Sequence, residues 1–529
     1  MFRILVSDKL GAEGLERLAQ ANDIQYDVKP GLSKEELLAI IPNYDALIIR
    51  SGTKADADLL AAGTKLIVVG RAGMGVDNVD VETATMRGII VMNTPGANSV
   101  ATAEQTMALM LAASRHTAQA HGSLAAGEWK RSSFTGQELY QKTLGIVGFG
   151  RIGRLVAERA QAFGMTVIAY DPFVSEHVGR EMNVTLVDLD DLWAQSDYIT
   201  LHTSLTPETQ KMINESTIAQ MKDGVIVINV ARGKLVDEAD LAAALKSGKV
   251  KAAGLDVFSS EPPTSDNPVM GLPNVVHTPH LGASSVEAQR EVAVQIVDQV
   301  LDVLRGVDFR NAVNMPFQIG TDFAAIRPYL SLAEKIGHLQ ATLAPQPIER
   351  LELGVRGDAV EKLVKAIASG LLKGVLMGQT ADHVNYTNAP LLAQEYGVAI
   401  TQTAGTTMAD YPNEIVCRAF WDGGERLIAG VLFGGSEPRI VQVDNYKLEA
   451  KPDGVVLVLQ NQDVPGVIGQ VGTILSAYGV NIGEWRLGRD KPGGEALSFI
   501  NLDSRPSEVV MRTLEEITAV TQAKLVTLD

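Results

Sequence analysis

The sequence lacks several features that define whole classes of proteins. Cys417 is its only cysteine, which excludes internal disulfides and any zinc site built from several cysteines. Lys and Arg number 46 against 63 Asp and Glu, a net charge of −17, and no basic run occurs, so nucleic-acid binding is not expected. No apolar run approaches the length that spans a bilayer, and the first strand is too short for a signal peptide. We therefore expect a cytoplasmic protein with small-molecule partners, no membrane partner and no metal site.

An even apolar content along the 529 residues predicts about three to four folded domains. At the start of the chain, short apolar segments alternate with helical patterns, which is typical of a parallel α/β sheet. A helical stretch over residues 99–126, rich in Ala, Met and Leu, is expected to link this unit to the next and to pack against another domain or subunit. The strands expected in the first unit are residues 2–6, 26–28, 46–49, 66–69 and 89–92.

A second α/β unit opens with three closely spaced glycines. Gly148, Gly150 and Gly153 lie between an aliphatic strand, residues 144–147, and a helical pattern, residues 152–163. In a dinucleotide-binding turn the first glycine permits the tight turn, the second lets backbone N–H groups approach a pyrophosphate, and the third lets helix and strand pack closely. The helix N-terminus then faces the phosphates. Spacing and context together predict a dinucleotide site.

An acidic residue selects the cofactor within this unit. Asp171 ends the next predicted strand, residues 165–170, about 20 residues after the glycines, as the dinucleotide pattern requires. Its carboxylate is expected to accept hydrogen bonds from the ribose hydroxyls of NAD and to repel the 2′-phosphate of NADP. Pro172 and Phe173 offer no compensating cation. The prediction is therefore NAD, with a turn or helix-capping aspartate as the alternative.

Three polar residues follow strands of the same predicted sheet. Arg232, Glu261 and His280 lie just beyond strands expected to end at residues 229, 256 and 277, on the edge where a nicotinamide should lie. Arg232 offers a planar fork of donors for a carboxylate and for developing negative charge, and His280 offers an acid or base for proton transfer. Glu261 is expected to fix the histidine tautomer and to favour its protonated form. The set predicts hydride transfer on a 2-hydroxy or 2-keto acid. The alternative is that Arg232 caps a helix, Glu261 is a solvated loop residue and His280 is a structural histidine.

Cations also follow strands of the first sheet. Arg50 and Ser51 come after one predicted strand, and Arg71 comes after the next, again at the ligand-binding edge. Each arginine taken singly would be interpreted as a surface ion-pair residue. Two arginines beside serine and glycine at neighbouring strand ends favour an anion site.

Several of these motifs resemble a known family. Arg232-Gly, Glu261-Pro-Pro, Pro279-His280-Leu-Gly-Ala and the run from Gly148 to Gly153 are similar to the D-2-hydroxyacid dehydrogenases over about residues 1–312. The resemblance implies two Rossmann-like parallel-sheet domains with the active site in the cleft between them. The substrate domain would comprise residues 1–97 and 283–312, around an NAD-binding domain of residues 98–282.

The motifs at residues 50–51, 70–73, 76–80 and 91–95 resemble in particular the branch of that family that acts on D-3-phosphoglycerate. This resemblance implies a homo-oligomeric enzyme, a homotetramer in the family, in which Arg131 reaches a neighbouring subunit's site. Substrate contacts are implied at Arg50, Ser51, Arg71 and Asn98. Cofactor contacts are implied at Gly148, Gly150, Arg151, Ile152, Gly153, Asp171, Thr203, Ala231, Asp256 and Gly282.

The last third of the chain shows no catalytic set. Residues 313–450 mix helical and β patterns and resemble the intervening domain of long members of the family, with a plain spacer domain as the alternative. Residues 451–529 predict a ferredoxin-like βαββαβ order and resemble the ACT domain, a small amino-acid-binding module. Asp463 and Asn481 suit the amino and carboxylate groups of an effector, which the resemblance implies is L-serine. A purely structural ACT module is the alternative.

Taken together, the resemblance implies NAD-dependent oxidation of D-3-phosphoglycerate to 3-phosphohydroxypyruvate, the first step of L-serine synthesis, under feedback by L-serine. Two alternatives stay open. One is another D-2-hydroxyacid dehydrogenase, such as a hydroxypyruvate or glyoxylate reductase. The other is a non-catalytic NAD-sensing protein on the same fold, because such proteins can retain the three polar residues.

Overall fold

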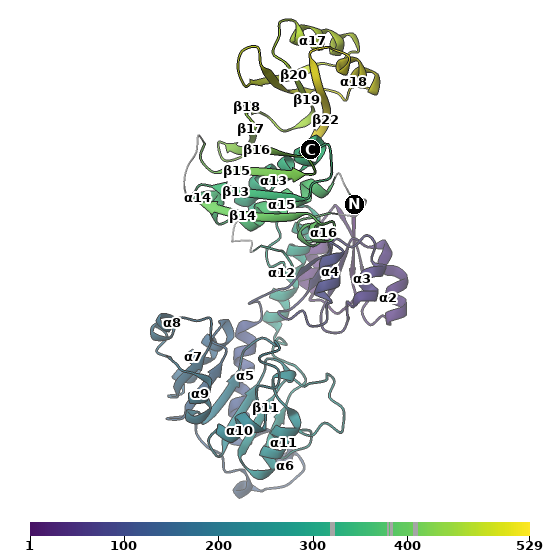
Figure 1. Ribbon diagram of the computed structural model, residues 1–529. Coiled ribbons are helices and arrows are strands. Elements are labelled where there is room, and N and C mark those ends of the chain that lie inside the picture. The colour runs from purple at the N-terminus through teal and green to yellow at the C-terminus, as the bar shows by residue number, and fades with distance from the viewer. Residues whose placement is uncertain (318–322, 378–379, 381–383, 406–410, 529) are drawn as a thin grey trace.

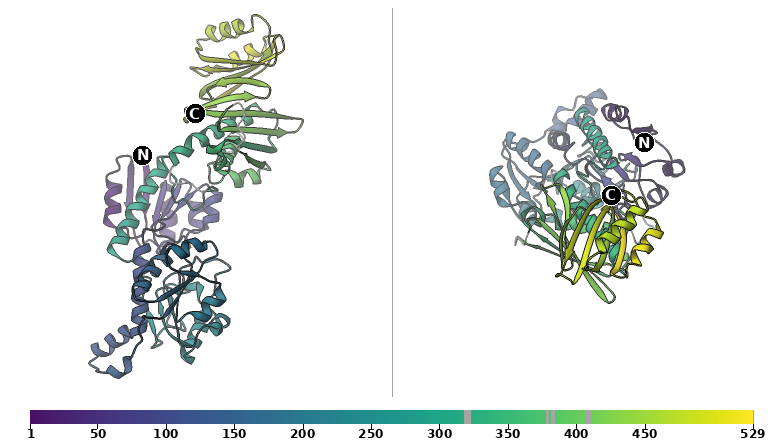
Figure 2. Two further views of the ribbon diagram at one scale, coloured as in Figure 1. Left: turned by 90° about the vertical axis from the view of Figure 1, so that its left-hand side faces the viewer. Right: turned by 90° about the horizontal axis from the view of Figure 1, so that it is seen from above.

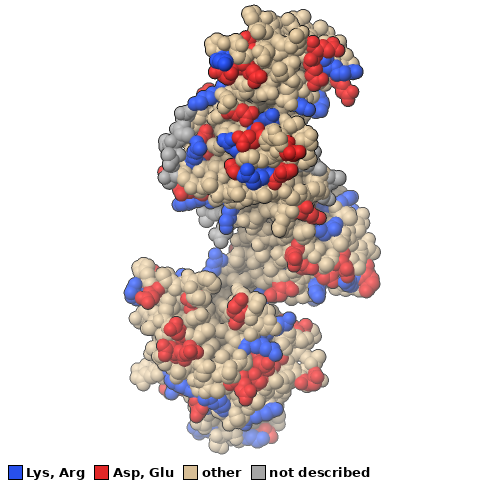
Figure 3. Space-filling model, in the orientation of Figure 1, with Lys and Arg blue, Asp and Glu red and all other residues tan. Residues whose placement is uncertain are grey.

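The computed structural model describes residues 1–317, 323–377, 380, 384–405 and 411–528. Four sheets with their own helices follow one another along an elongated molecule (Figures 1 and 2). Within these residues no helix is long and apolar enough to cross a bilayer. On the face in Figure 3, Lys and Arg are interspersed with Asp and Glu, and no extended basic patch is visible there.

The substrate domain contains a five-stranded parallel sheet, which confirms the predicted α/β class. Its order is β2-β1-β3-β4-β5, and Arg71 is itself the last residue of β4, two residues beyond the predicted end. The sheet carries α1 (Ala12–Ala19), α2 (Lys34–Ile40), α3 (Ala57–Ala62) and α4 (Val81–Met86). The strands are β1 (Phe2–Val6), β2 (Ile24–Val28), β3 (Ala46–Ile49), β4 (Val68–Arg71) and β5 (Ile90–Met92).

A helix from much later in the chain completes this domain. α12 (Val286–Leu304) follows the NAD domain and buries Ile296 and Val300 against the first sheet. A Cβ atom at Gly70 of β4 would lie 2.6 Å from a methyl carbon of Val300, so glycine permits the close approach. The chain therefore leaves this domain after β5 and returns to it with α12.

The NAD domain contains a seven-stranded parallel sheet of order β12-β11-β10-β9-β6-β7-β8. The helix expected over residues 99–126 is wrong as a single element. α5 (Ser99–Arg115) and α6 (Thr117–Ala125) are separated by His116, whose φ of 54° breaks the helix. Helices α7 (Arg151–Ala162), α8 (Glu176–Glu181), α9 (Leu189–Gln195), α10 (Glu215–Gln220) and α11 (Glu238–Ser247) accompany the strands. The strands are β6 (Thr143–Val147), β7 (Thr166–Tyr170), β8 (Thr185–Leu186), β9 (Tyr198–Leu201), β10 (Val225–Asn229), β11 (Val250–Leu255) and β12 (Val275–His277).

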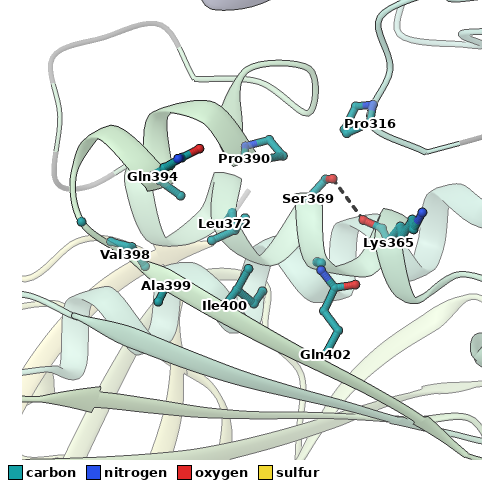
Figure 4. A pocket seen from close by; sticks show the side chains of 13 residues that line it. Pro316, Lys365, Ser369, Leu372, Pro390, Gln394, Val398, Ala399, Ile400 and Gln402 are labelled. Atoms are coloured by element: carbon teal, nitrogen blue, oxygen red, sulfur yellow. Dashed lines mark hydrogen bonds between the residues drawn. The ribbon is translucent and has the colours of Figure 1, made fainter.

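The intervening domain has a six-stranded mixed sheet of order β14-β13-β15-β16-β17-β18. α13 (Phe323–Leu343) and α15 (Val364–Met377) pack together on the sheet. A pocket of about 600 Å³ opens between α15, α16 (Ala389–Glu395) and β14, and Ser369, Leu372 and Gln402 line it (Figure 4). The strands are β13 (Arg350–Arg356), β14 (Ala399–Gly405), β15 (Glu414–Trp421), β16 (Gly424–Phe433), β17 (Glu437–Val443) and β18 (Tyr446–Ala450), of which β14 and β18 were not predicted.

The ACT domain has the predicted βαββαβ order and an antiparallel sheet, β20-β21-β19-β22. Its elements are β19 (Gly454–Gln462), α17 (Val467–Ala477), β20 (Ile482–Arg489), β21 (Glu495–Leu502), α18 (Glu508–Glu515) and β22 (Val520–Leu528). Lys335 of α13, which is only 8% exposed, donates hydrogen bonds to the carbonyls of Pro452 and Leu528. One buried lysine thus ties both ends of the ACT domain to the intervening domain. The four sheets lie inside the four predicted domains, whose boundaries stay predictions.

Candidate active site

Of the three glycines in the turn between β6 and α7, only one has space for a side chain. Gly148 has φ +94°, and a Cβ atom there would lie 2.7 Å from the carbonyl of His202. A Cβ atom at Gly153 would lie 2.2 Å from the carbonyl oxygen of Gly148, so the helix packs directly on the turn. Nothing lies within 4 Å of a Cβ atom at Gly150. The open side of the turn is where backbone N–H groups can meet a pyrophosphate.

Asp171 directly follows β7 and lies beside this turn. One of its carboxylate oxygens accepts a hydrogen bond from the N–H of Phe149 at 2.9 Å, and the other accepts from the N–H of Phe173 at 2.9 Å. Each carboxylate oxygen can accept a second bond, so ribose hydroxyls can still be bound. The neighbouring Phe173 side chain is 95% exposed. The ribose contact of Asp171 stays a prediction.

His280 and Glu261 form a close pair on the NAD-domain side of the boundary between the first two domains, here called the cleft, which the hydrogen bond from Arg232 to Asp77 spans. The Nδ1 atom of His280 lies 2.6 Å from Oε2 of Glu261, and Oε1 of Glu261 accepts a hydrogen bond from the N–H of Phe258 at 3.1 Å. Burial works to raise the pKa of Glu261, but the bond to His280, the Phe258 N–H and the charges of His280 and Arg232 lower it overall. The carboxylate is therefore ionised, and it leaves Nε2 of His280 as the ring nitrogen available for proton transfer.

Asp256 holds the loop that carries His280. It is fully buried, and its oxygens accept hydrogen bonds from the Thr278 hydroxyl at 2.6 Å and from the N–H groups of Leu281 at 2.7 Å and Gly282 at 2.8 Å. The structure therefore shows Asp256 as an anchor for the loop over residues 278–282. The cofactor contacts expected of Asp256 and Gly282 stay predictions.

Three arginines from two domains face the same cleft. Arg71 is mostly buried, and its pKa falls to about 10 because of burial and the positive charges of Arg232 and Arg50, with Asp77 opposing the shift. Nε of Arg232 donates a hydrogen bond across the cleft to Asp77 at 2.9 Å. The structure thus brings together the two sets of strand-end residues that the sequence predicted separately.

Glycines make space for these guanidinium groups. A Cβ atom at Gly75 would lie 1.9 Å from Nη2 of Arg232, and one at Gly73 would lie 1.6 Å from Nη1 of Arg71. Any side chain at either position would push the arginine away. The two glycines therefore make room for the guanidinium groups of the predicted anion site, which fits the expectation that glycine lies beside arginine there.

The loop that carries Arg50 and Ser51 is fixed by two residues that sequence reasoning missed. Asp8 accepts hydrogen bonds from the N–H groups of Arg50 at 2.6 Å and Thr53 at 3.0 Å. Asn78 donates from its amide to the carbonyls of Arg50 and Thr53, both at 2.6 Å. Asp8 lies just beyond β1, the same signal that identified Arg50, so strand-end reasoning applied to β1 would have found it.

The segment between β5 and α5 crosses from one domain to the other. Thr94 donates its N–H to the carbonyl of Gly73, and Arg151 of α7 donates to the carbonyl of Pro95, each at 3.0 Å. Oδ1 of Asn98 is buried and has no hydrogen-bond partner among the described residues. A buried acceptor without a partner is available to a donor on a ligand, such as a substrate hydroxyl.

The remaining predicted residues fall into two groups. Thr203 and Ala231 follow β9 and β10 at the cofactor edge, and Ile152 lies in the first turn of α7. Arg131 is exposed and follows α6, which lies at the end of the NAD domain away from the cleft (Figure 1). The expectation that Arg131 reaches a neighbouring subunit's site stays a prediction.

The two predicted effector residues are far apart. Asp463 follows the C-terminal end of β19, whereas Asn481 precedes the N-terminal end of β20, whose first residue, Ile482, is paired through Leu502 with Val455 at the start of β19. At about 3.3 Å per residue along β19, the two side chains lie roughly 25 Å apart. One small ligand therefore cannot contact both side chains within a single chain, and the effector role of Asp463 and Asn481 stays a prediction.

Comparisons with known proteins cover the whole chain. Residues 107–282 match the NAD-binding domain of D-isomer specific 2-hydroxyacid dehydrogenases, residues 325–444 the D-3-phosphoglycerate dehydrogenase intervening domain, and residues 455–519 the ACT domain. D-3-phosphoglycerate dehydrogenase of Methanocaldococcus jannaschii is 42% identical over 529 residues, all of both chains. That of Bacillus subtilis is 38% identical over 528 residues, again all of both.

Solved structures match the first two domains. A glyoxylate reductase of Paecilomyes thermophila is 31% identical with a TM-score of 0.54, and it covers 59% of this chain and 98% of its own. The glyoxylate reductase thus matches the part of the chain that contains the first two domains. The full-length relatives also match the intervening and ACT domains. The chain belongs to the D-3-phosphoglycerate dehydrogenase family of NAD-dependent D-2-hydroxyacid dehydrogenases.

Proposed function

We propose that this protein oxidises D-3-phosphoglycerate to 3-phosphohydroxypyruvate with NAD, as the first step of L-serine biosynthesis in the cytoplasm. The observation that carries the proposal is the gathering of Arg50, Arg71 and Arg232 beside the His280–Glu261 pair. A substrate with a carboxylate and a phosphate has two anionic ends, which suits a cleft with cations from two domains.

Each member of the catalytic set has a separate task. When bound, NAD accepts the hydride that leaves C2 of the substrate. Arg232 binds the substrate carboxylate and stabilises negative charge on the C2 oxygen. Nε2 of His280 takes the hydroxyl proton, and Glu261 stabilises the imidazolium that results because its carboxylate lies 2.6 Å from Nδ1. In the reverse direction the same histidine returns the proton.

Arg50, Ser51 and Arg71 are proposed to hold the phosphate. Arg71 is removed from water and faces two other cations, so a bound dianion relieves both the burial cost and the repulsion. Asn98 is proposed to bind the substrate hydroxyl or carboxylate through its amide. The glycine turn, Asp171 and the strand-end residues Thr203 and Ala231 are proposed to hold NAD.

The ACT domain is proposed to bind L-serine between two copies of the chain. Because Asp463 and Asn481 lie at opposite ends of one sheet, a single ligand contacts both only if each comes from a different copy. α6 supports self-association, since none of its residues is buried and Trp129 beyond it is 82% exposed. We propose a homotetramer in which Arg131 enters a neighbouring cleft.

The direct test is NADH oxidation by the purified protein with 3-phosphohydroxypyruvate, hydroxypyruvate and glyoxylate, each with and without L-serine. A preference for the phosphorylated acid of at least about 100-fold in kcat/KM is expected from its extra charged hydrogen bonds, and serine should lower turnover. Preference for an unphosphorylated acid would assign a different substrate. Binding of NADH without turnover of any acid would favour the NAD-sensing alternative.

A further inference from the structure

Among the residues that the structure describes, Asp77 is an acid that bonds across the cleft. It lies in the loop after β4 of the substrate domain, yet its Oδ2 atom accepts a hydrogen bond from Nε of Arg232 in the NAD domain at 2.9 Å. The Asp77 side chain is 60% exposed and that of Arg232 is 30% exposed. The pair therefore lies open to solvent and to any ligand that enters the cleft.

Asp77 is bonded to a donor of Arg232, Nε, that a substrate carboxylate would use. A guanidinium group presents Nε and Nη2 side by side, a spacing that matches the two oxygens of a carboxylate. Nε is already bonded to Asp77, and Nη1 donates to the carbonyl of Ala231 at 2.8 Å. An incoming carboxylate must therefore displace Asp77 to gain the side-on pair of donors.

The charges of the cleft explain why an internal acid is useful there. Arg50 and Arg232 repel the charge of Arg71, and the negative charges of Asp77 and Asp8 partly offset that repulsion. Asp8 is fixed by the N–H groups of Arg50 and Thr53 and by the Thr53 hydroxyl. Asp77 makes one side-chain hydrogen bond among the described residues. It is thus the acid that is free to move.

We propose that Asp77 stands in for the substrate carboxylate: it neutralises Arg232 in the empty cleft and gives way when the anionic substrate binds. This inference rests on the proposed role of Arg232 in carboxylate binding. Asp77 is then a positioning residue that lowers the affinity of the cleft for all anions. Inorganic anions, which offer no second charged end for Arg50 and Arg71, are excluded most effectively.

The test is Asp77→Asn, which removes the charge with little change of shape. The KM for 3-phosphoglycerate should fall about 2- to 5-fold, the size expected for release of a half-exposed ion pair, with kcat changed less than about 2-fold. Inhibition by sodium sulfate should strengthen by at least the same factor. Asp77→Ala should shift both quantities in the same direction, so the result does not depend on one variant.

Asp58→Asn is the matched control. Asp58 is 72% exposed and pairs with Lys34, so this change removes the same charge from the substrate domain outside the cleft. It should leave the KM and the sulfate inhibition unaltered. A higher KM or a lower kcat in Asp77→Asn would mean that Asp77 orients Arg232 for catalysis, and it would overturn the proposal.

A second measurement needs no turnover. Sodium sulfate should raise the melting temperature of NAD-free Asp77→Asn more than that of the unmodified protein, because its cations are less neutralised. If sulfate stabilises Asp77→Asn more but the unmodified protein does not oxidise 3-phosphoglycerate, the proposed function is wrong and the role of Asp77 as an internal anion stands. Normal turnover with an unchanged KM and an unchanged sulfate effect would remove the Asp77 proposal alone.

Discussion

The cleft is built between parallel sheets, whereas the ACT domain is built on an antiparallel one. In a parallel sheet all strands end at one edge, so Arg232 after β10 and His280 after β12 reach the same place. In the ACT domain the loops after β19 and before β20 leave opposite ends of the sheet. A residue that borders a strand therefore predicts a site only when the direction of the strand is also known.

The two regions also differ in what one chain completes by itself. Within one chain, the cleft brings together the His280–Glu261 pair and the predicted arginines. The predicted effector residues instead form hydrogen bonds at opposite ends of the ACT sheet. The Asn481 amide donates to the Asp503 carboxylate at 2.7 Å, and the Asp463 carboxylate accepts from the N–H of Gly493 at 3.1 Å. The comparison predicts that changes in the cleft alter chemistry in every chain, whereas changes in the ACT domain alter regulation between chains.

The largest effect is expected from the base of the cleft. His280→Ala removes the group that is proposed to take the hydroxyl proton, so kcat should fall about 10²- to 10⁴-fold. NADH binding, measured by fluorescence titration, should stay within about 2-fold, because none of the glycine-turn contacts changes. His177→Ala is the control, since His177 is 72% exposed on α8 and pairs with Glu181. A fall of less than about 10-fold would remove His280 from the mechanism.

A smaller and selective effect is expected at the phosphate side of the cleft. Arg50→Ala removes the charged hydrogen bonds that Arg50 is proposed to donate to the phosphate, so kcat/KM for 3-phosphohydroxypyruvate should fall about 10- to 100-fold. Hydroxypyruvate has no phosphate, and its kcat/KM should change less than about 3-fold. Arg3→Ala provides a control within the same sheet, because Arg3 pairs with Asp27 at the surface. Equal losses on both acids would show that Arg50 does not bind the phosphate.

The Glu261 carboxylate should appear in the pH dependence of stability. The net effect of its contacts is a pKa below the ordinary value of 4.5. A lowered pKa in the folded state gives stability that is present above the unfolded pKa and is lost as pH falls through the folded value. The unmodified protein should therefore be more stable than Glu261→Gln near pH 7, and the difference should shrink below about pH 4.5. Urea unfolding at both pH values measures it, and a constant difference would contradict the ionised pair.

Strand-end reasoning predicted most of the cleft because both sheets are parallel. It located Arg50, Arg71, Arg232 and His280 from buried strands followed by polar residues, without any contact being known. It did not predict the bond between Arg232 and Asp77, because the two residues belong to different domains and no local pattern relates them. Domain packing decides that contact.

Other features could not be predicted from the sequence because the local pattern of residues does not indicate them. The residues around His116 have good helix-forming composition, and only the φ of 54° at that residue separates α5 from α6. β14 is an edge strand with the sequence AITQTAG, whose side chains are mostly exposed and show no alternation of apolar and polar residues. β8 has two residues and offers no pattern at all.

The smallest effect on turnover, and the sharpest test of the comparison, lies in the ACT domain. Asp463→Asn and Asn481→Ala should each weaken inhibition by serine while leaving kcat within about 1.5-fold without serine, because neither side chain is near the cleft. If the site is shared between copies, some interfaces in a mixture of the two variants combine two unmodified residues. Serine binding measured by calorimetry should then recover in the mixture to an intermediate level.

The mixture must be prepared by refolding the two variants together, with each variant refolded alone as the control. A shared site predicts that neither variant alone binds serine well and that the mixture does, since the unmodified Asp463 of one copy meets the unmodified Asn481 of another. A site within one chain predicts no recovery, because every chain then carries a defect. Absence of recovery would contradict the proposal that the serine site is formed between two chains, unlike the cleft, which one chain forms by itself.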